Sequence, residues 1–531
     1  MAKGLAYQPL TNLGVNGLNL QHNPSTLDNS WLTSANNIML RESGRISFRK
    51  GLKQKVVPTG TAIASLVEHN DQGTNKIFAS YGTSIYTIDF TSPNAAFPAS
   101  GADVKHTVSG SSGDWQFVNF NNRLHCFHEG IVPQRYDGAL GSGSKWAAFD
   151  NSTKPSGVTD FDPSCGMGYY GRMFVGGVTE EKDVVHYSVL LDSDDFTGTG
   201  SGLIDLKKVW GTDEIVNIAA FFGKLIIFGK KNIAIYDNPA DIANATLDEV
   251  ISGIGLVHRD TVQAVGDDLV FLSDTGLRSL SRTTEKDKLP LTDYSINIKD
   301  TLIRHIGLST NVRSIYVENE GVYILSFIDK NVTYTFDFKH FTPNKVPRVT
   351  TWTFDLDREP ASMAYTKLYS GLLVGQKDGG IAGYEGFIDI DLSWDSGAVY
   401  TNASYTSDIT SVWINLGQSV QSAILKRMIL VLEGGSGAEL SLRWYKDFSN
   451  NSSATTLIDL RPDSTGSTAL WGNAASLYGA AKFTPIYGLK EYKTPLTGSA
   501  KHLKLNITIE SNGFGGSIQN LILLHKEGKI R

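Results

Sequence analysis

The sequence predicts an all-β protein: a six- or seven-bladed β-propeller followed by a C-terminal antiparallel β-sandwich. A β-hairpin unit recurs seven times in the first part of the chain, at the spacing typical of propeller blades. Glycine contributes 53 of 531 residues and aromatic residues 10%, as expected for short strands joined by tight turns. Helical periodicity is limited to Asp241–Glu249 and Ile296–Ile306, so little helix is expected.

Each repeat has an apolar strand, a polar or glycine-containing turn and a second strand. The hairpins begin at Lys76, Arg123, Arg172, Lys224, Asp268, Gly321 and Gly371. A further apolar strand precedes each hairpin: Ile63–Glu68, Trp115–Phe120, Cys165–Tyr170, Ile215–Phe221, Thr261–Val265, Val312–Val317 and Met363–Tyr369. One such sheet cannot bury both of its faces, so neighbouring sheets must stack around an axis. The blade count stays open between six and seven, because an N-terminal strand could complete the first blade or one copy could belong to a neighbouring element.

Residues 1–60 form a separate N-terminal arm and hairpin in this interpretation. Two strands are expected at Ile38–Arg41 and Arg45–Arg49. The segment is locally basic, through Arg41, Arg45, Arg49, Lys50, Lys53 and Lys55. Such a charge run is typical of the solvated face of a hairpin. The alternatives are a docking arm or the strand that closes the propeller ring.

The propeller is expected over residues 61–387 and the sandwich over 388–531. Seven longer strands are predicted in the sandwich: Val399–Ser404, Ser411–Leu416, Lys426–Glu433, Ala438–Tyr445, Thr455–Asp459, His502–Ile509 and Ser517–His525. The segment Arg461–Gly498 lies between the predicted strands Thr455–Asp459 and His502–Ile509. It has little periodicity and is expected to be a long loop. A loop of this length in a compact domain is usually functional or is ordered by a partner.

The chain is mildly acidic, with a net charge of −6 and a pI near 6.0, and has no long basic block. This balance argues against tight binding of nucleic acid, which needs clustered cations. It is compatible with a wall along which DNA slides. The N-terminus lacks the pattern of a secretory signal peptide, and no apolar run approaches the length of a membrane span.

Metal sites and disulfides are not expected. Cys126 and Cys165 lie on or beside predicted strands, where small buried thiols are ordinary. His125 and His128 flank Cys126 and superficially suggest metal ligands, but positions three apart in a strand face opposite sides. No cofactor is indicated, because the glycines around Gly434 form a hairpin turn without the residues of a phosphate loop.

Catalytic constellations are also not expected, and the chain is predicted not to be an enzyme. The pairs Asp194/Asp195 and Asp267/Asp268 could supply the two carboxylates of a glycosidase. Adjacent residues on a strand point to opposite faces, however, and on a turn they usually cap backbone groups. A partial sialidase-like turn at Ser273 stands alone, and no Gly-x-Ser-x-Gly elbow is found.

The N-terminal run LDNSWLTSANNIMLRESGRISFRKGLKQ resembles the opening of the tail nozzle proteins of short-tailed bacteriophages, also called tail tubular protein B-like or packaged-DNA stabilisation proteins. The positions that match are Asn37, Arg41, Gly44, Arg49 and Gly51. The segment GRMFVGG from Gly171, the segment from Val184, and the C-terminal run from Lys501 also look similar to phrases of this family.

The resemblance implies a virion structural protein of the tail, assembled in the cytoplasm of the host bacterium. It implies a homo-oligomeric ring, generally a hexamer, below the portal and adaptor proteins, with the C-terminal platform domain lining a tube for DNA. Tail fibres or tip proteins would be further partners, and DNA would pass without sequence-specific binding. The five matching residues would serve assembly.

Two other classes of function stay open at this point. One is a carbohydrate-binding or glycan-degrading propeller, because propellers host such activities at the mouth of the central channel. The other is an ordinary cellular propeller scaffold. A ring with a central hole would favour the tail protein, and binding or hydrolysis of glycans by the isolated chain would favour the first alternative.

Overall fold

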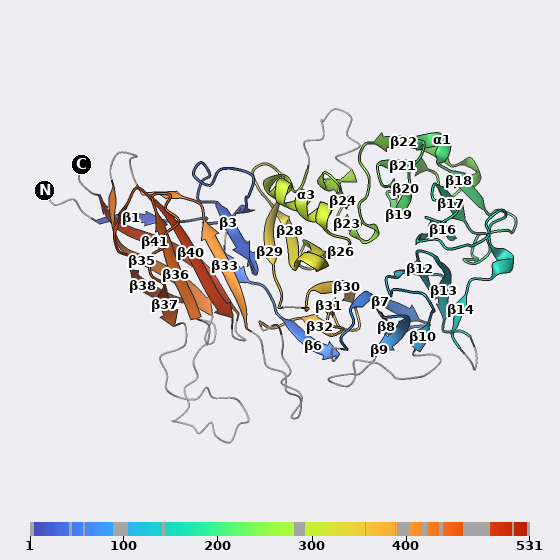
Figure 1. The fold of residues 1–531 in the computed structure, drawn as a ribbon, viewed down its shortest axis with the longest axis horizontal. Coiled ribbons are helices and arrows are strands. Elements are labelled where there is room, and N and C mark those ends of the chain that lie inside the picture. Colours follow the sequence, from blue (N-terminus) through green and yellow to red (C-terminus); the bar gives the residue numbers. More distant parts are fainter. Residues whose placement is uncertain are drawn as a thin grey trace, which may run out of the picture. The chain divides into compact units, whose positions relative to one another are not determined.

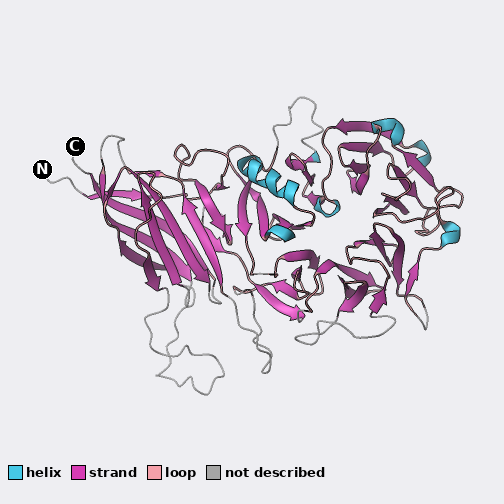
Figure 2. Ribbon diagram, viewed as in Figure 1, coloured by secondary structure: helices cyan, strands magenta, loops and turns pink. Residues whose placement is uncertain are grey.

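The structure is a computed structural model that describes residues 5–41, 45–56, 59–88, 105–140, 144–280, 293–355, 357–387, 389, 404–416, 422–434, 439–459, 489–511 and 515–527. It is mostly β-structure (Figures 1 and 2). The chain divides into two compact units. We call residues 54–333 and 356–383 the propeller unit, and residues 1–53, 334–355 and 384–531 the terminal unit, because the latter contains both ends of the chain.

The propeller unit confirms the predicted all-β propeller, with six blades as separate sheets among the described residues. Four sheets each contain four strands that are consecutive in the chain. The first two are β7 (Ile63–Asp71), β8 (Thr74–Tyr81), β9 (Ser84–Ile88) and β10 (Lys105–Thr107), and β11 (Gln116–Phe120), β12 (Arg123–His128), β13 (Ile131–Asp137) and β14 (Trp146–Ala148). The next two are β15 (Cys165–Tyr169), β16 (Arg172–Gly176), β17 (Val184–Tyr187) and β18 (Gly202–Asp205), and β19 (Ile215–Phe221), β20 (Lys224–Gly229), β21 (Asn232–Asp237) and β22 (Thr246–Ser252). A fifth contains β23 (Gln263–Val265), β24 (Asp268–Ser273) and β25 (Gly276–Ser279).

The sixth sheet closes the ring. It contains β30 (Pro360–Thr366), β31 (Gly371–Gln376), β32 (Ile381–Tyr384) and the N-terminal strand β6 (Leu52–Val56), in the order β30-β31-β32-β6. Val56 of β6 shares a core cluster with Leu373 and Ile381. A strand from residues 1–60 therefore completes the last blade and closes the ring, which was one of the alternatives for the N-terminal segment, whereas the alternative that it completes the first blade is wrong.

The sixth predicted repeat, whose hairpin was expected from Gly321, forms the antiparallel pair of β26 (Val312–Val317) and β27 (Val322–Phe327). It is not one of the six separate sheets, but β26 contacts both β23 and β30. The sheets and this hairpin follow one another around a ring (Figure 1).

Apolar side chains of neighbouring blades form the core. One cluster joins Phe174 of β16 with Ile218 of β19 and Leu225 of β20. Another joins Phe228 of β20 with Phe271 of β24, whose rings lie 5.2 Å apart. Each sheet thus covers a face of the next, as the stacking argument requires.

Helix is scarce, but one helical prediction is wrong. Residues 241–249 contain only the short 3-10 turn η3 (Ile242–Asn244) and then enter β22, which pairs with β21. Tertiary strand pairing overrides the local periodicity there. The prediction at Ile296–Ile306 is confirmed by η5 (Ile296–Ile298) and α3 (Lys299–Leu308). The other helical turns are η2 (Asn151–Thr153), α1 (Lys207–Trp210), η4 (Arg259–Thr261) and η6 (Ile328–Lys330).

The terminal unit combines strands of both chain ends with residues 334–355, and most of its strands pair antiparallel, whereas β2 (Gly17–Leu18), β3 (Trp31–Asn36) and β29 (Pro347–Trp352) pair with one another in parallel. One sheet has the order β38-β35-β41-β5-β4, with β1 beside β41 and β39 beside β35. Its strands are β1 (Leu5–Pro9), β4 (Ile38–Leu40), β5 (Ile46–Phe48), β35 (Ala423–Gly434), β38 (Leu489–Pro495), β39 (Ser499–Ala500) and β41 (Gly516–Glu527). The pairing of β4 with β5 confirms the predicted N-terminal hairpin.

The second sheet of this unit runs β29-β2-β3-β33-β40-β36-β37, with β34 beside β40. Its strands are β2 (Gly17–Leu18), β3 (Trp31–Asn36), β29 (Pro347–Trp352), β33 (Tyr405–Ser411), β34 (Ile414–Asn415), β36 (Glu439–Lys446), β37 (Thr456–Asp459) and β40 (His502–Ser511). The strand β28 (Val332–Phe341) precedes β29. N-terminal strands β3 and β5 pair with C-terminal strands β33 and β41, respectively.

The predicted long loop Arg461–Gly498 is partly wrong. Residues 461–488 lie outside the described residues, but Leu489–Pro495 is the strand β38, which pairs along β35. Residues 399–403 of the predicted strand Val399–Ser404 also lie outside the described residues. The sequence missed β38 because LKEYKTP is largely exposed on both faces and therefore lacks a clear apolar alternation.

Candidate functional site

The residues of the N-terminal phrase meet in the interior of the terminal unit. Arg49, which follows β5, is fully buried. Its Nη1 and Nη2 donate to the two carboxylate oxygens of Asp389 at 2.7 and 2.6 Å, and its Nε donates to Asn37 Oδ1 at 2.9 Å. The guanidinium carbon lies 4.7 Å from the ring centre of Phe354 and 4.1 Å from that of Tyr405. This is a bidentate ion pair enclosed by aromatic rings.

Asn37 connects the ion pair to the sheets. Its backbone has a left-handed conformation with φ of 56°, which asparagine tolerates better than most residues. Its Nδ2 donates to Thr406 O at 2.8 Å, and its Oδ1 accepts from Thr353 N at 3.0 Å. Burial disfavours the charged form of Arg49, but Asp389 outweighs this effect and raises the pKa of Arg49.

The other phrase positions are less central. Gly51 N donates to Gly386 O at 2.9 Å, Arg41 is half-buried and pairs through its backbone with Arg45, and Gly44 lies outside the described residues. An assembly role for Asn37, Arg41, Gly44, Arg49 and Gly51 stays a prediction. The side chains of Asn37 and Arg49 are buried and cannot contact a neighbouring subunit, so their role in assembly would have to be indirect.

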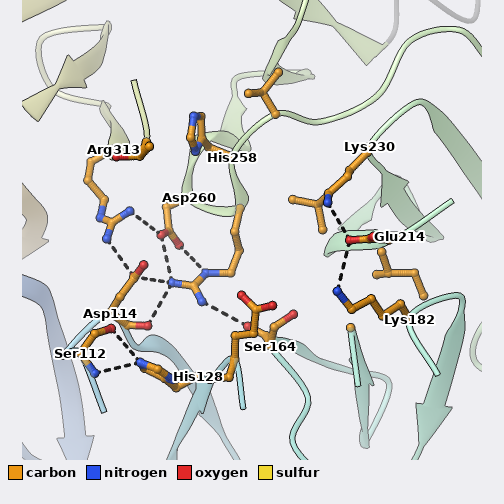
Figure 3. A pocket seen from close by; sticks show the side chains of 17 residues that line it. Ser112, Asp114, His128, Ser164, Lys182, Glu214, Lys230, His258, Asp260 and Arg313 are labelled. Atoms are coloured by element: carbon orange, nitrogen blue, oxygen red, sulfur yellow. Dashed lines mark hydrogen bonds and ion pairs between the residues drawn. The ribbon is translucent and has the colours of Figure 1, made fainter. Parts of the chain in front are cut away.

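A separate cavity of about 290 Å³ lies at the centre of the propeller unit (Figure 3). Its lining includes residues at the starts of the innermost strands of five consecutive repeats, among them Asp114, Ser164, Glu214, Arg259 and Arg313. We call it the hub cavity. A second cavity of about 250 Å³ shares the lining residues Arg259, Asp260 and Arg313.

Two arginines and two aspartates form one network in the hub cavity (Figure 3). Arg259 Nη2 lies 2.7 Å from Asp114 Oδ1, and its Nε lies 3.1 Å from Asp260 Oδ1. Arg313 bridges the same two carboxylates at 2.8 and 3.1 Å. Arg259 also donates to Ser164 O at 3.2 Å. The network therefore joins strand starts from four different repeats.

The charges of the network compensate one another. Burial disfavours ionised Asp260, but Arg259 and Arg313 outweigh burial and lower the pKa of this carboxyl. Burial likewise disfavours charged Arg259, yet Asp260 and Asp114 raise its pKa. With its pKa lowered in this way, Asp260 is a poor proton donor near neutral pH. The network therefore suits a structural role, in which ion pairs hold the strand starts of different repeats together.

A third lining carboxylate is paired at the edge of the cavity. Glu214 Oε2 lies 2.6 Å from Lys230 Nζ and 3.5 Å from Lys182 Nζ, and the pKa of Glu214 is lowered chiefly by its hydrogen bond to Lys230. The Nε2 atom of His128 forms a hydrogen bond of 2.8 Å with Ser112 Oγ. Glu214, Lys230 and Lys182 at this edge, and His128 with Ser112, are thus engaged by one another.

The cysteines and histidines considered as ligands have structural surroundings. Cys126 and Cys165 are free thiols and fully buried, as predicted, and burial raises the pKa of Cys165 to about 12. His125 is fully buried against Phe149, and burial lowers its pKa to about 3. Within the described part of the chain, no group of three or more His, Cys, Asp or Glu side chains could hold a metal ion.

The candidate carboxylate pairs do not form common sites. Asp194 pairs with Arg135 and Arg123, whereas Asp195 Oδ1 accepts from the backbone N–H groups of Thr197 and Gly198. Asp268 accepts from Tyr294 Oη at 3.0 Å. Both members of the first pair therefore have separate structural partners.

Sequence reasoning missed the hub network. Asp114, Arg259 and Arg313 belong to different repeats, and only ring closure brings them together. The sequence did contain one indication of this network. Each of these charged residues lies at or just before the first strand of its repeat, so an alignment of the repeats would have placed them at the same end of the propeller.

No family model matches the chain, and no curated protein matches it. Among solved structures, the Neurospora crassa Pan2 WD40 domain is similar at 8% identity and a TM-score of 0.39, over 63% of this chain and 96% of that chain. The extracellular domain of a hybrid two-component system from B. thetaiotaomicron is similar at 10% identity and a TM-score of 0.40, over 68% of this chain and 44% of that chain. Neither similarity is close enough to indicate a function. None of the helices in the described ranges has the length and apolar character needed to cross a membrane.

Replacement of Arg49 by Ala is expected to destabilise the terminal unit by about 3–5 kcal/mol, because Asp389 is left as an unpaired buried charge. Chemical unfolding followed by tryptophan fluorescence measures this change. The matched control is Arg41→Ala, which removes an arginine from the same phrase and should change stability by about 0.5 kcal/mol or less. Equal effects of the two variants would contradict a central role for Arg49.

Replacement of Asp260 by Asn is expected to destabilise the propeller unit by about 1–3 kcal/mol at pH 7, because two arginines lose a charged acceptor. The folded-state pKa of Asp260 is lowered, so its contribution is present above the unfolded pKa and is lost as pH falls through the folded value. The difference between wild type and variant should therefore shrink below about pH 4. Thermal unfolding from pH 3 to 7 measures this, and a pH-independent difference would contradict the network.

Proposed function

We propose that the chain is a structural component of a bacteriophage tail that forms the nozzle ring extending the portal-adaptor channel. In this role it retains packaged DNA and conducts it during ejection. The observation that carries the proposal is the position of the phrase residues Asn37 and Arg49, which with Asp389 organise the interior of the terminal unit. Residues that organise a core are tied to one particular fold. A match at these positions therefore supports the resemblance to the nozzle family.

The hub cavity supports a structural role over acid–base chemistry. Asp114 and Asp260 each contact both Arg259 and Arg313. A glycosidase needs one carboxyl group with a raised pKa to protonate the leaving group. The lowered pKa of Asp260 is the opposite condition. Two arginines that are already paired are also poor receptors for a substrate carboxylate.

The proposed subunit would assemble as a homo-oligomeric ring, with head-tail adaptor proteins and tail fibres or tip proteins as partners. DNA would pass through the ring, and the net charge of −6 supports passage over retention on the wall. A ring built from heterologous contacts needs a rigid subunit with two different faces.

The purified full chain is expected to form closed rings with a central hole at micromolar concentration or after mixing with its adaptor protein. Native mass spectrometry gives the subunit number, six in the proposed arrangement, and negative-stain images give the hole. Antibodies raised against the chain should label the tails of intact particles. A chain that stays monomeric under both conditions and hydrolyses glycans would overturn the proposal in favour of a glycan-degrading propeller.

A further inference from the structure

A polar cavity of about 350 Å³ lies in the propeller unit at the ends of the strands β7 and β11. The hub cavity is lined by the starts of the innermost strands, so this second site lies toward the opposite ends of such strands. Half of its lining residues are asparagines: Asn70, Asn75, Asn119, Asn121 and Asn122. We call it the amide pocket.

Turn formation explains only some of these asparagines. Asn121 and Asn122 occupy a two-residue turn with φ of 51° and 56°, where asparagine is favoured. Asn70 Oδ1 accepts from Gly73 N at 2.9 Å in the preceding hairpin. Asn75 and Asn119, however, lie within strands, where asparagine is disfavoured. The fold therefore does not require this concentration of amides.

The pocket presents amides held in defined positions. Asn119 Oδ1 lies 2.7 Å from His69 Nδ1, and its Nδ2 donates to Glu68 O at 3.0 Å. Asn70 Nδ2 donates to Asn75 Oδ1 at 2.6 Å. The side chain of Asn122 forms no hydrogen bond with the described residues, so its donor and acceptor are available to a ligand.

The charge of the pocket favours an anionic ligand. Its one carboxylate, Glu68, accepts from the backbone N–H groups of Lys367 and Leu368 at 2.6 and 2.9 Å. Its two cations are Lys367 and Arg123. Arg123 is already paired with two aspartates, through its Nε with Asp137 at 2.8 Å and through its Nη1 with Asp194 at 3.7 Å. The ammonium of Lys367 has no ion-pair partner among the described residues, so it is the cation that favours an anionic ligand.

Exposed aromatic rings occupy the equivalent turns of the next two blades. Tyr170 and Phe222 both have φ of 44° and are 49% and 71% exposed. The same turn position holds Gln72 and Asn121 in the two preceding blades. A bulky residue in this conformation is an outlier, and these tight turns favour asparagine, aspartate or glycine. The turn does not require an aromatic residue, and each ring packs on the preceding one, Tyr170 on Tyr169 with 4.3 Å between ring centres and Phe222 on Phe221 with 4.4 Å, while the rest of its surface stays exposed.

These turns are continuous with the amide pocket. Asn121 Nδ2 donates to Leu191 O at 3.2 Å, and Leu191 N donates to Gly171 O at 2.6 Å, next to Tyr170. A Cβ built on Gly223, beside Phe222, would lie 4.0 Å from the Tyr170 hydroxyl. The amides and the exposed rings thus lie at the same end of four consecutive blades, and Lys367 follows β30 of the last blade.

We propose that the amide pocket and the adjoining rings of Tyr170 and Phe222 bind an acidic oligosaccharide. Amide groups both donate to and accept from neighbouring hydroxyl groups of a sugar. The apolar face of a sugar ring packs on an exposed aromatic ring. Lys367 supplies a charge-assisted hydrogen bond to a sugar carboxylate. This inference does not depend on the nozzle proposal, because a site for glycans on the propeller fits a tail protein and a cellular propeller equally.

The test measures binding of the full chain to a glycan array containing uronic acid and sialic acid oligosaccharides and neutral oligosaccharides of the same length. An acidic glycan that binds is then titrated by calorimetry against variants. Asn122→Gly should weaken binding about tenfold through loss of a hydrogen-bonding amide. It should preserve the turn, since glycines at 73, 171 and 223 occupy the equivalent second position in sister turns. Lys367→Ala should weaken binding of acidic but not neutral glycans.

Phe222→Asn separates binding from folding. It should weaken binding while leaving the Tm unchanged or higher, because asparagine suits the left-handed turn. The matched control, Gln72→Asn, alters the same turn position in a blade turn outside the pocket lining and should leave binding unchanged. Absence of binding to every glycan on the array, or binding unaffected by both Asn122→Gly and Phe222→Asn, would overturn the proposal. Ring assembly is scored separately by microscopy, so failure of one proposal does not imply failure of the other.

Discussion

The propeller unit depends on one packing constraint: a sheet of three or four strands has two apolar faces and can cover neither by itself. Phe174, Phe228 and Phe271 are fully buried only because the next sheet lies over them. A row of sheets would leave its first and last faces in water, so the row must close. Strand β6 achieves closure by joining the chain before the first blade to the last blade. Closure also makes each blade depend on the two beside it.

Ring closure has an electrostatic consequence at the hub. The starts of the innermost strands converge there, and their charged residues are partly removed from water. An unpaired charge in such a position would be costly, whereas Arg259 and Arg313 can each satisfy two carboxylates through their several N–H groups. The network of Asp114, Asp260 and these arginines therefore follows from the architecture. Its presence at a propeller centre is not in itself a sign of catalysis.

Local pattern was sufficient to predict the hairpins, because alternation of apolar residues and a tight turn lie within fifteen or so residues of each other. It failed where a distant strand decides the structure. Helical periodicity was found over Asp241–Glu249, yet Thr246–Ser252 forms β22 because β21 offers a free edge. Strand β38 is exposed on both faces and exists through its pairing with β35. The contact of Arg49 with Asp389 spans 340 positions and could not be inferred from spacing.

The repeated turns offer a comparison within one molecule that separates folding from function. Gln72, Asn121, Tyr170 and Phe222 occupy the same position in four consecutive blades, with φ between 44° and 51°. The backbone requirement is therefore the same at all four, and polar residues meet it at two of them. Tyrosine and phenylalanine are unfavourable in this conformation, and each packs on the ring that precedes it, with 4.3 Å between the ring centres of Tyr169 and Tyr170 and 4.4 Å between those of Phe221 and Phe222. That contact still leaves 49% of Tyr170 and 71% of Phe222 exposed. Since the turn does not require these two rings and one neighbouring ring covers them only in part, we explain their exposed surface by what it contacts outside the chain.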